Sequence, residues 1–134
     1  MMKSIKLPMF RANGTRVQLK DLLESIPDNQ WSWLVIDYYG TGKAPSGMSM
    51  PEFESYLRSC ANGFEMSWQE LQSFASHLEQ TIDCLIVAVD STEQIDLGRL
   101  EETNFRGCHC VLQAFDSTEW RFSASDAELL VKVH

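Results

Sequence analysis

The alternation of apolar and polar positions predicts short strands interspersed with helices. A short strand is expected at residues 5–7, and apolar residues at helical spacing predict a first helix over 18–25. The segment 31–39, W-S-W-L-V-I-D-Y-Y, is short, aromatic and β-branched, and it predicts a largely covered strand. Its four aromatic side chains are expected mainly in the core, although alternation along a strand also leaves room for an exposed pair.

Two further helices are each announced by a capping box. Ser49 with Glu52, and Ser67 with Glu70, have the spacing at which a hydroxyl and a carboxylate satisfy each other's free backbone amides. Residues 40–47, G-T-G-K-A-P-S-G, precede the first of these helices and are the most flexible-looking segment. The second helix carries an apolar stripe that requires a sheet to cover it.

The second half of the chain completes the predicted fold. Cys84–Val89 has no polar residue on either face, which predicts a central strand. Residues 97–103 predict one or two helical turns, and Cys108–Phe115 with 119–122 predicts a hairpin. A third capping box, Ser125 with Glu128, predicts a last short helix. We therefore expect one α/β (α+β) domain over 1–134, with a mixed central sheet, helices packed on it, and a C-terminal hairpin plus short helix.

The chain contains an internal echo. C-L-I-V-A-V-D-S-T-E, residues 84–93, recurs as C-V-L-Q-A-F-D-S-T-E, residues 110–119, with the same cysteine, alanine and D-S-T-E ending. Each copy predicts a buried strand that runs into a polar turn. Two copies are too few for a repeat architecture, so the echo predicts two similar acidic strand ends within one domain.

Charge narrows the classes of partner. The chain has 11 Lys and Arg against 19 Asp and Glu, a formal net charge of −8. A phosphate backbone binds proteins through Lys and Arg that displace counterions, so we expect no direct nucleic-acid partner. A basic protein matches this charge, although acidity that serves only solubility accounts for it equally.

Four cysteines, at positions 60, 84, 108 and 110, are expected to be reduced. The N-terminus, M-M-K-S-I-K, is interrupted by Pro8 and lacks the apolar core of a secretory signal, which predicts a cytoplasmic protein. No apolar run has the length of a membrane span.

Signatures of catalysis, metal binding and cofactor binding are weak. Cys108-His109-Cys110 has zinc-ligand chemistry, but strand periodicity predicts both cysteines on one face and His109 on the other, so we expect buried thiols and no metal. Gly40-Thr41-Gly42-Lys43 lacks the earlier glycine of a phosphate loop. No nucleophile motif is present, and we expect neither an enzyme nor a cofactor.

Carboxylates at the ends of the echoed strands form the candidate binding surface. If the two strands are neighbours, these groups converge on one rim of the sheet, where Trp120 would supply an aromatic anchor. The alternatives are Asx turns at Asp90 and Asp116 with solvated neighbours, or a calcium site on the rim. The predicted partner-binding residues are Asp90, Glu93, Asp96, Asp116, Glu119 and Trp120.

The closing segment 115–130, F-D-S-T-E-W-R-F-S-A-S-D-A-E-L-L, resembles the end of small bacterial immunity proteins of polymorphic toxin and contact-dependent growth inhibition systems. It is also similar to an uncharacterised bacterial family of comparable length with the same strand–D-S-S–strand ending. The first resemblance implies a catalytically inert cytoplasmic protein that binds a co-produced toxin domain, frequently a basic nuclease.

The predicted function is therefore neutralisation of a cognate, basic toxin domain through an acidic and partly aromatic face. The alternative is a small-ligand-binding or regulatory domain with a pocket near residues 40–47, lined by Tyr38, Tyr39 and Lys43. An enzyme is the third reading.

Overall fold

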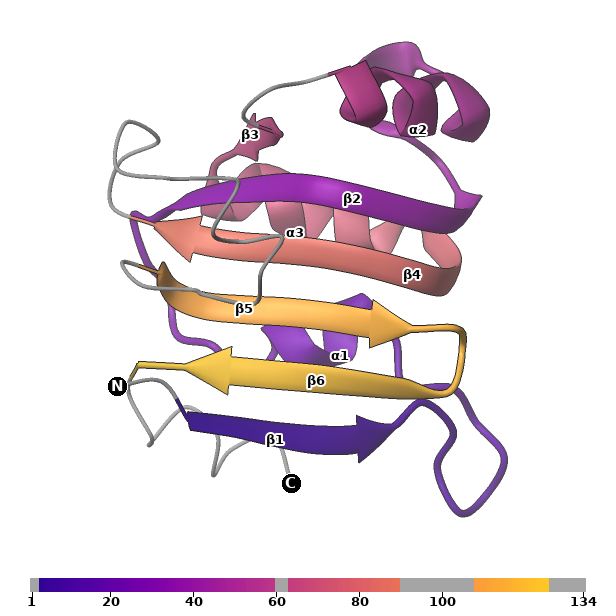
Figure 1. The fold of residues 1–134 in the computed structure, drawn as a ribbon, viewed down its shortest axis with the longest axis vertical. Coiled ribbons are helices and arrows are strands. Elements are labelled where there is room, and N and C mark those ends of the chain that lie inside the picture. Colours follow the sequence, from indigo (N-terminus) through magenta and orange to yellow (C-terminus); the bar gives the residue numbers. More distant parts are fainter. Residues whose placement is uncertain (1–2, 60–62, 90–107, 126–134) are drawn as a thin grey trace.

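Six strands and three α-helices make up the structure, a computed structural model that describes residues 3–59, 63–89 and 108–125 (Figure 1). In chain order they are β1 (Lys3–Pro8), α1 (Leu19–Leu23), β2 (Ser32–Gly42), a 3-10 turn η1 (Pro45–Gly47), α2 (Met50–Ser59), β3 (Phe64–Met66), α3 (Trp68–Ser76), β4 (Leu78–Val89), β5 (Cys108–Phe115) and β6 (Glu119–Ala124). The expected helical turns at 97–103 and the last helix after Ser125 lie outside the described residues.

The strands form one sheet in the order β1-β6-β5-β4-β2-β3. The predicted α+β class and the central position of the strand that contains Cys84–Val89 are confirmed. The sheet is not mixed as expected, because each pairing between the described strands is antiparallel. The unit β3–α3–β4 does join two strands that run in the same direction, but β2 lies between them and pairs antiparallel with both.

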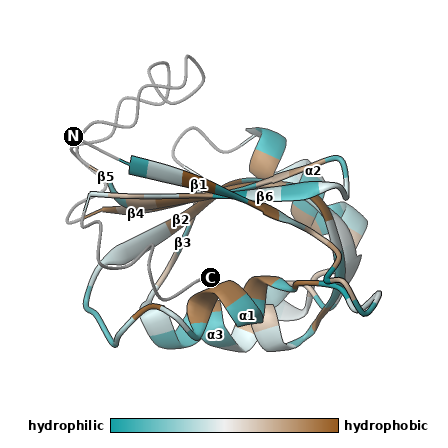
Figure 2. Ribbon diagram, turned by 90° about the horizontal axis from the view of Figure 1, so that it is seen from below, coloured by the Kyte–Doolittle hydropathy of each residue, from teal (hydrophilic) through white to brown (hydrophobic). Residues whose placement is uncertain are grey.

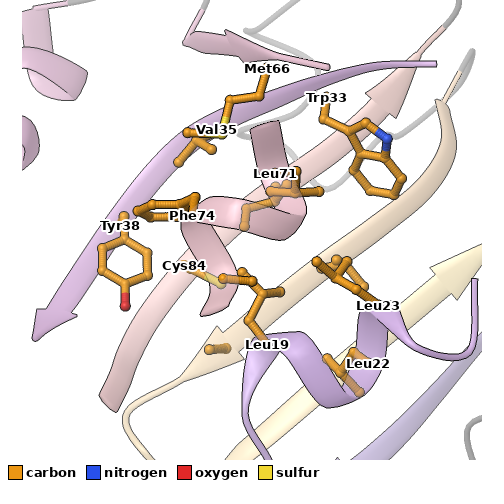
Figure 3. Packing of buried hydrophobic residues seen from close by; sticks show 14 of the residues in the cluster. Leu19, Leu22, Leu23, Trp33, Val35, Tyr38, Met66, Leu71, Phe74 and Cys84 are labelled. Atoms are coloured by element: carbon orange, nitrogen blue, oxygen red, sulfur yellow. The ribbon is translucent and has the colours of Figure 1, made fainter. Parts of the chain in front are cut away.

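Helices α1 and α3 lie on the same side of the sheet, which we call the inner face (Figure 2). Leu71 and Phe74 of α3 and Leu22 of α1 meet Trp33 and Cys84 of the sheet in the main core (Figure 3). Helix α2 packs beside β2 and adds Met50, Phe53 and Leu57 to the same core.

The helices begin where their capping residues predicted. The Glu52 amide donates to Ser49 Oγ (3.3 Å), while the Ser49 amide donates to Glu52 Oε1 (3.2 Å). The second capping box has the same reciprocal bonds at Ser67 and Glu70, with distances of 2.9 and 3.2 Å. These bonds satisfy amides that have no partner within the helix, and they fix the position at which each helix leaves the sheet.

The opposite side of the sheet, the outer face, is divided in two along the strands. At the end where β4 finishes and β5 begins, its side chains are buried and apolar: Leu34, Val87, Val89, Cys108 and Val111. At the other end, beside the β5–β6 turn, the side chains are polar. The polar side chains of the outer face therefore lie near the β5–β6 hairpin.

The elements differ from the prediction in their bounds, most clearly at β4, which begins at Leu78 and not at Cys84. The glycine-rich stretch begins as strand, since residues 40–42 continue β2 alongside the start of β4. Here Gly40 and Gly42 let the backbones of β2 and β4 approach more closely than any side chain permits. The short strand β3 was not predicted, because three residues carry too little periodicity.

Truncation of Leu71 tests the packing of α3 on the inner face. Leu71 is 0% exposed, whereas the neighbouring Gln72 is exposed. We expect Leu71→Ala to lower the free energy of unfolding by about 3 kcal/mol, through lost apolar contacts and a residual cavity. Urea unfolding followed by circular dichroism measures this, with Gln72→Ala as the control. A loss below about 1 kcal/mol for Leu71→Ala would contradict the packing.

Candidate functional site

The two acidic strand ends of the echo do not converge. Strand β4 ends at Val89, which pairs with Cys108 at the start of β5, whereas Asp116 follows the far end of β5. Antiparallel pairing therefore places the last residue of β4 and the last residue of β5 at opposite ends of the strand pair, about 23 Å apart along β5. The expectation of one shared rim is wrong. Asp90, Glu93 and Asp96 themselves lie outside the described residues.

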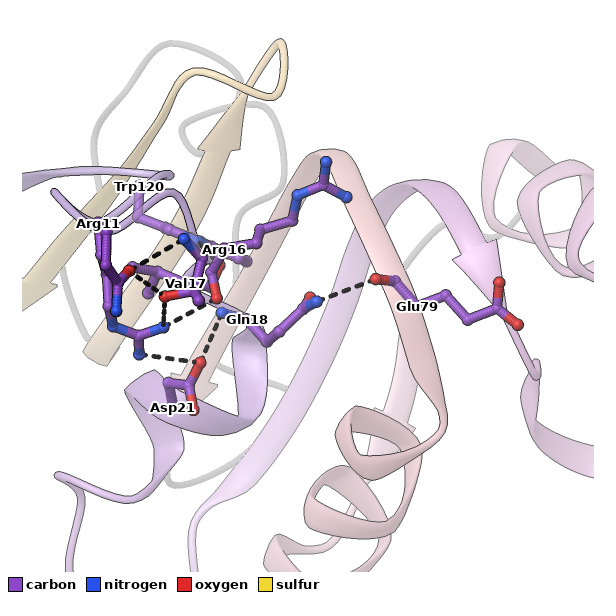
Figure 4. A network of polar contacts seen from close by, with 9 residues as sticks. Arg11, Arg16, Val17, Gln18, Asp21, Glu79 and Trp120 are labelled. Carbon is purple, nitrogen blue, oxygen red and sulfur yellow. Dashed lines mark hydrogen bonds and ion pairs between the residues drawn. The ribbon is translucent and has the colours of Figure 1, made fainter.

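Trp120 is a core residue and not an exposed anchor. Its side chain is 0% exposed, and its indole Nε1 donates to the carbonyl oxygen of Val17 (2.8 Å). The segment that supplies this oxygen is held in place by a polar network (Figure 4), in which Arg11 pairs with Asp21 (3.3 Å). The prediction that Trp120 contacts a partner is therefore wrong, since β6 turns this residue towards the helices.

The hairpin brings the two remaining predicted residues to the outer face. Asp116 is exposed, and Glu119 is half-buried at the first position of β6. Because Trp120 points into the core, its neighbours Glu119 and Arg121 point to the outer face. Similarly, buried Ala114 on β5 turns Phe115 outward.

Strands β2 and β4 add further side chains to the same end of the outer face. Tyr38 and Cys84 are buried on the inner face, so Tyr39 and Asp83 point outward. A β-bulge at residue 36 keeps Asp37 on the outer side as well. We call the resulting set the acidic patch: Asp37, Tyr39, Asp83, Phe115, Asp116 and Glu119.

The strand register gives the patch its dimensions. Tyr39 pairs with Asp83, and Phe115 pairs with Glu119. Since Cys84 aligns with Ala114, Asp83 lies next to Phe115, and these four residues form a row across four neighbouring strands. With strands about 4.8 Å apart, the row is about 14 Å long. Asp37 and Asp116 flank it along the strand direction.

Backbone hydrogen bonds hold the turn against β4. The turn consists of the three residues 116–118, in which Asp116 and Ser117 both have positive φ angles, 55° and 60°, and the Thr118 amide donates to the Phe115 carbonyl oxygen (2.9 Å). The Asp116 amide donates to Asp83 Oδ1 (2.9 Å), and the Ser117 amide donates to the Ile82 carbonyl oxygen (2.9 Å). Asp116 therefore lies in the turn with its carboxylate exposed, but its bond to β4 runs through its backbone amide and not through the carboxylate that an Asx turn uses.

The patch carries more negative than positive charge. In the described part of the chain the ion pair joins Arg11 to Asp21, and no described cation forms an ion pair with the four carboxylates of the patch. One described cation lies over the patch, since the Arg121 guanidinium is 4.9 Å from the centroid of the Phe115 ring. Tyr39 is 54% exposed and gives the patch an accessible aromatic ring.

Sequence reasoning missed Asp37 and Asp83 as site residues, and it named Tyr39 only for the pocket of the alternative function. The sequence did contain a signal for these three residues. Each of them is next to a buried residue on an apolar strand, so alternation along the strand turns its side chain to the opposite face. The echo drew attention to the residues after each strand, whereas the patch is formed by residues within the strands.

A cleft lies between α3 and the segment before α2. Its volume is about 380 Å³, and its walls include Lys43, Ser46, Glu70, Ser73 and His77. Phe64, Met66 and Phe74 form its apolar part. Lys43 lines it as the alternative function expected, but Tyr38 and Tyr39 are not among its lining residues, because Tyr38 points into the core and Tyr39 to the outer face.

A β-bulge also changes the cysteine arrangement. Val89 pairs with Cys108 and Ala88 with Cys110, so His109 is the extra residue. Cys108 joins the apolar outer-face cluster and Cys110 the main core, which makes the prediction of a shared face wrong. His109 stacks on Trp31, with ring centroids 4.5 Å apart.

The described residues contain neither a metal-binding cluster nor a membrane-spanning helix. No group of three or more His, Cys, Asp or Glu side chains in ranges 3–59, 63–89 and 108–125 is arranged to hold a metal ion. No helix in these ranges combines the length and apolarity that crossing a membrane requires.

Burial governs the reactivity of the cysteines. Cys84, Cys108 and Cys110 are buried and form no disulfide. Burial raises the pKa of Cys84, and it raises the pKa of Cys108 from 9.0 to about 11. At neutral pH the thiols of Cys84 and Cys108 therefore stay protonated, and a protonated thiol is a poor nucleophile.

Alkylation tests the burial of Cys108. At pH 8 we expect iodoacetamide to modify Cys108 about a hundredfold more slowly in the folded protein than in concentrated urea, because its thiolate fraction is lower. Peptide mass spectrometry measures both rates. As the pH rises, the Cys108 thiol ionises in the unfolded protein before it ionises in the folded protein. The contribution of the protonated thiol to the stability of the folded state is therefore present below pH 9 and is lost between pH 9 and about 11. Equal rates in the folded and unfolded protein would contradict this assignment.

Substitution of Gly42 tests the close contact between the end of β2 and the end of α3, beside the cleft. Gly42 has a φ of +132°, and an added Cβ would lie 2.6 Å from the His77 carbonyl oxygen. We expect Gly42→Ala to destabilise the protein by more than about 2 kcal/mol in urea unfolding. Gly14→Ala is the control, since Gly14 also has a positive φ, +86°, but faces open space. Equal losses for the two variants would contradict the close approach of β2 to the end of α3.

Comparisons of the chain with protein-family models, with curated proteins and with solved structures returned no match. The resemblance of residues 115–130 to immunity proteins therefore stays a prediction. Two regions of the described structure carry chemistry for a functional argument: the acidic patch and the cleft beside α3.

Proposed function

We propose that this protein is a non-catalytic inhibitor that neutralises a basic toxin domain by docking the acidic patch over it. The observation that carries the proposal is the presence on one sheet face of four carboxylates without a described ion-pair partner, with an exposed tyrosine at the edge of the group. Negative charge of this kind accelerates the encounter with a positively charged protein and disfavours other partners.

The sheet suits this role because the patch is preorganised. Asp37, Tyr39, Asp83 and Glu119 lie on strands whose other face is covered by the main core. Their backbones therefore lose little conformational freedom on binding, which leaves more of the interaction energy for affinity. Tyrosine at the edge of such a patch supplies apolar contact area at low entropic cost, as in many interface hot spots.

Charge and mechanism agree in this proposal. A nuclease toxin needs a basic surface to hold a phosphate backbone. An acidic protein that covers this surface excludes the substrate without any chemistry of its own. The resemblance of the hairpin segment 115–130 to immunity proteins supports the same class of partner.

Charge reversal tests the acidic patch. The binding partner in this test is the co-produced toxin domain that the proposal expects. We expect Asp37→Lys with Glu119→Lys to slow association at least tenfold at low salt and to reduce the salt dependence of the rate. Surface plasmon resonance at several salt concentrations measures both quantities, and survival of toxin-expressing cells reports neutralisation.

The matched control is Glu24→Lys, an exposed carboxylate at the end of α1, on the inner side of the sheet. We expect it to change the association rate less than twofold. If Glu24→Lys slows association as much as the double variant does, net charge and not the patch governs binding. If the double variant binds and protects like the wild type, these residues are not the site.

A further inference from the structure

The cleft beside α3 is separate from the acidic patch. It is lined by α3, β3 and the segment 43–46, and it includes no residue of the patch. Its volume of about 380 Å³ falls within the range of about 300–1,000 Å³ that small-molecule sites occupy. The cleft therefore has the size of a site for a small ligand.

The walls of the cleft are fixed before any ligand arrives. The Lys43 amide donates to the His77 carbonyl oxygen (3.0 Å), which ties the 43–46 segment to the end of α3. The Met48 amide donates to the Pro45 carbonyl oxygen (3.2 Å), and Ser46 adopts a left-handed conformation with a φ of 59°. Conformations of this kind cost energy and cluster at ligand sites.

The floor of the cleft is apolar and packed. Phe74 is 5% exposed and makes edge contacts with Tyr38 and Phe53, with ring centroids 5.5 and 5.6 Å away. Met66 is also buried, and Phe64 is half-buried against Phe53. Such a floor fits a hydrocarbon or aromatic body, whose burial is favourable in proportion to its apolar area.

The charged groups are separated along the cleft. Lys43 and His77 lie at the end of α3, while Glu70 lies in its first turn, about 10 Å away along the helix axis. No described carboxylate forms an ion pair with Lys43. His77 Nδ1 donates to the Ser73 carbonyl oxygen (2.8 Å), so Nδ1 carries a hydrogen.

The two ends of the cleft differ in whether their charged side chain already has a bonding partner. Glu70 Oε1 accepts a hydrogen bond from the Ser67 amide (2.9 Å) at the start of α3, where helix polarity also favours a negative charge. One oxygen of this carboxylate is therefore used in the cap of α3, while the group keeps its negative charge. Lys43 has no such partner among the described residues, so the cationic end of the cleft is the one that lacks a counter-charge.

We propose that this cleft binds a small amphiphilic carboxylate, with its anionic group at Lys43 and its apolar body on Phe64, Met66 and Phe74. The inference does not rest on the docking of a toxin, since it uses none of the residues of the acidic patch. It gives the protein a second site at which a metabolite can bind.

Two probes of the same length and opposite charge test the proposal. Octanoate and octylammonium are titrated into the full-length protein and followed through backbone amide chemical shifts. We expect octanoate to bind saturably, with a dissociation constant on the order of 1 mM and with the largest shifts at Lys43, Ser46 and His77. Octylammonium should bind at least tenfold more weakly.

Variants at Lys43 then reverse this preference. Lys43→Gln should weaken octanoate binding, and Lys43→Glu should weaken it at least tenfold while strengthening octylammonium binding. The matched control is Lys20→Glu, an exposed lysine on α1, which should change octanoate binding less than twofold. Circular dichroism confirms that each variant is folded, and Gln keeps the test interpretable if Glu perturbs the segment.

Three results would overturn the proposal. These are octanoate binding without saturation or with shifts centred away from the cleft, equal binding of the two probes to the wild type, and unchanged octanoate binding in both Lys43 variants. None of them bears on the charge-reversal test of the acidic patch, so the two proposals fail independently.

Discussion

The antiparallel pairing of β4 with β5 is the constraint on which the rest of the structure depends. These two strands form the centre of the sheet, and their register aligns Cys84 with Ala114 on the inner face. The same register sets Asp83 beside Phe115 on the outer face and ties the hairpin turn to β4. It also places the last residue of β4 and the last residue of β5 at opposite ends of this strand pair. One pairing thus creates the acidic patch and removes the shared rim that the echo suggested.

The two faces of the sheet have different roles, since the inner face forms the main core and the outer face carries the acidic patch. On the inner face, α1 and α3 cover one main core, to which α2 adds residues from beside β2, and each of three buried tryptophans donates its indole hydrogen to an oxygen outside the strands. Buried indole groups that are satisfied in this way fix the connecting segments on the sheet. The outer face is then available for charge, and the end of α3 shapes the cleft. Both candidate sites are consequences of how the core is covered.

Local signals in the sequence predicted local structure well. The capping boxes located the starts of α2 and α3, and the continuous apolar run located β4, because short-range bonds and burial decide these features. Strand direction and bulges were not predictable, since they depend on partners distant in sequence. The bulge at His109 separates Cys108 from Cys110, and parity along β6 buries Trp120 between Glu119 and Arg121. The patch residues Asp37 and Asp83 could be recognised only once β2 and β4 were known to be neighbours.

The central claim is that an excess of negative charge is concentrated at the hairpin end of the outer face. Titration of the protein with hexalysine, followed through backbone amide chemical shifts, tests it most directly, because a short polycation reports where negative potential is strongest. The account predicts that the largest shift changes occur at Asp37, Tyr39, Asp83 and Glu119 and that they vanish at high salt. Equal or larger changes at Asp21 and Glu24 of the α1 region would contradict it.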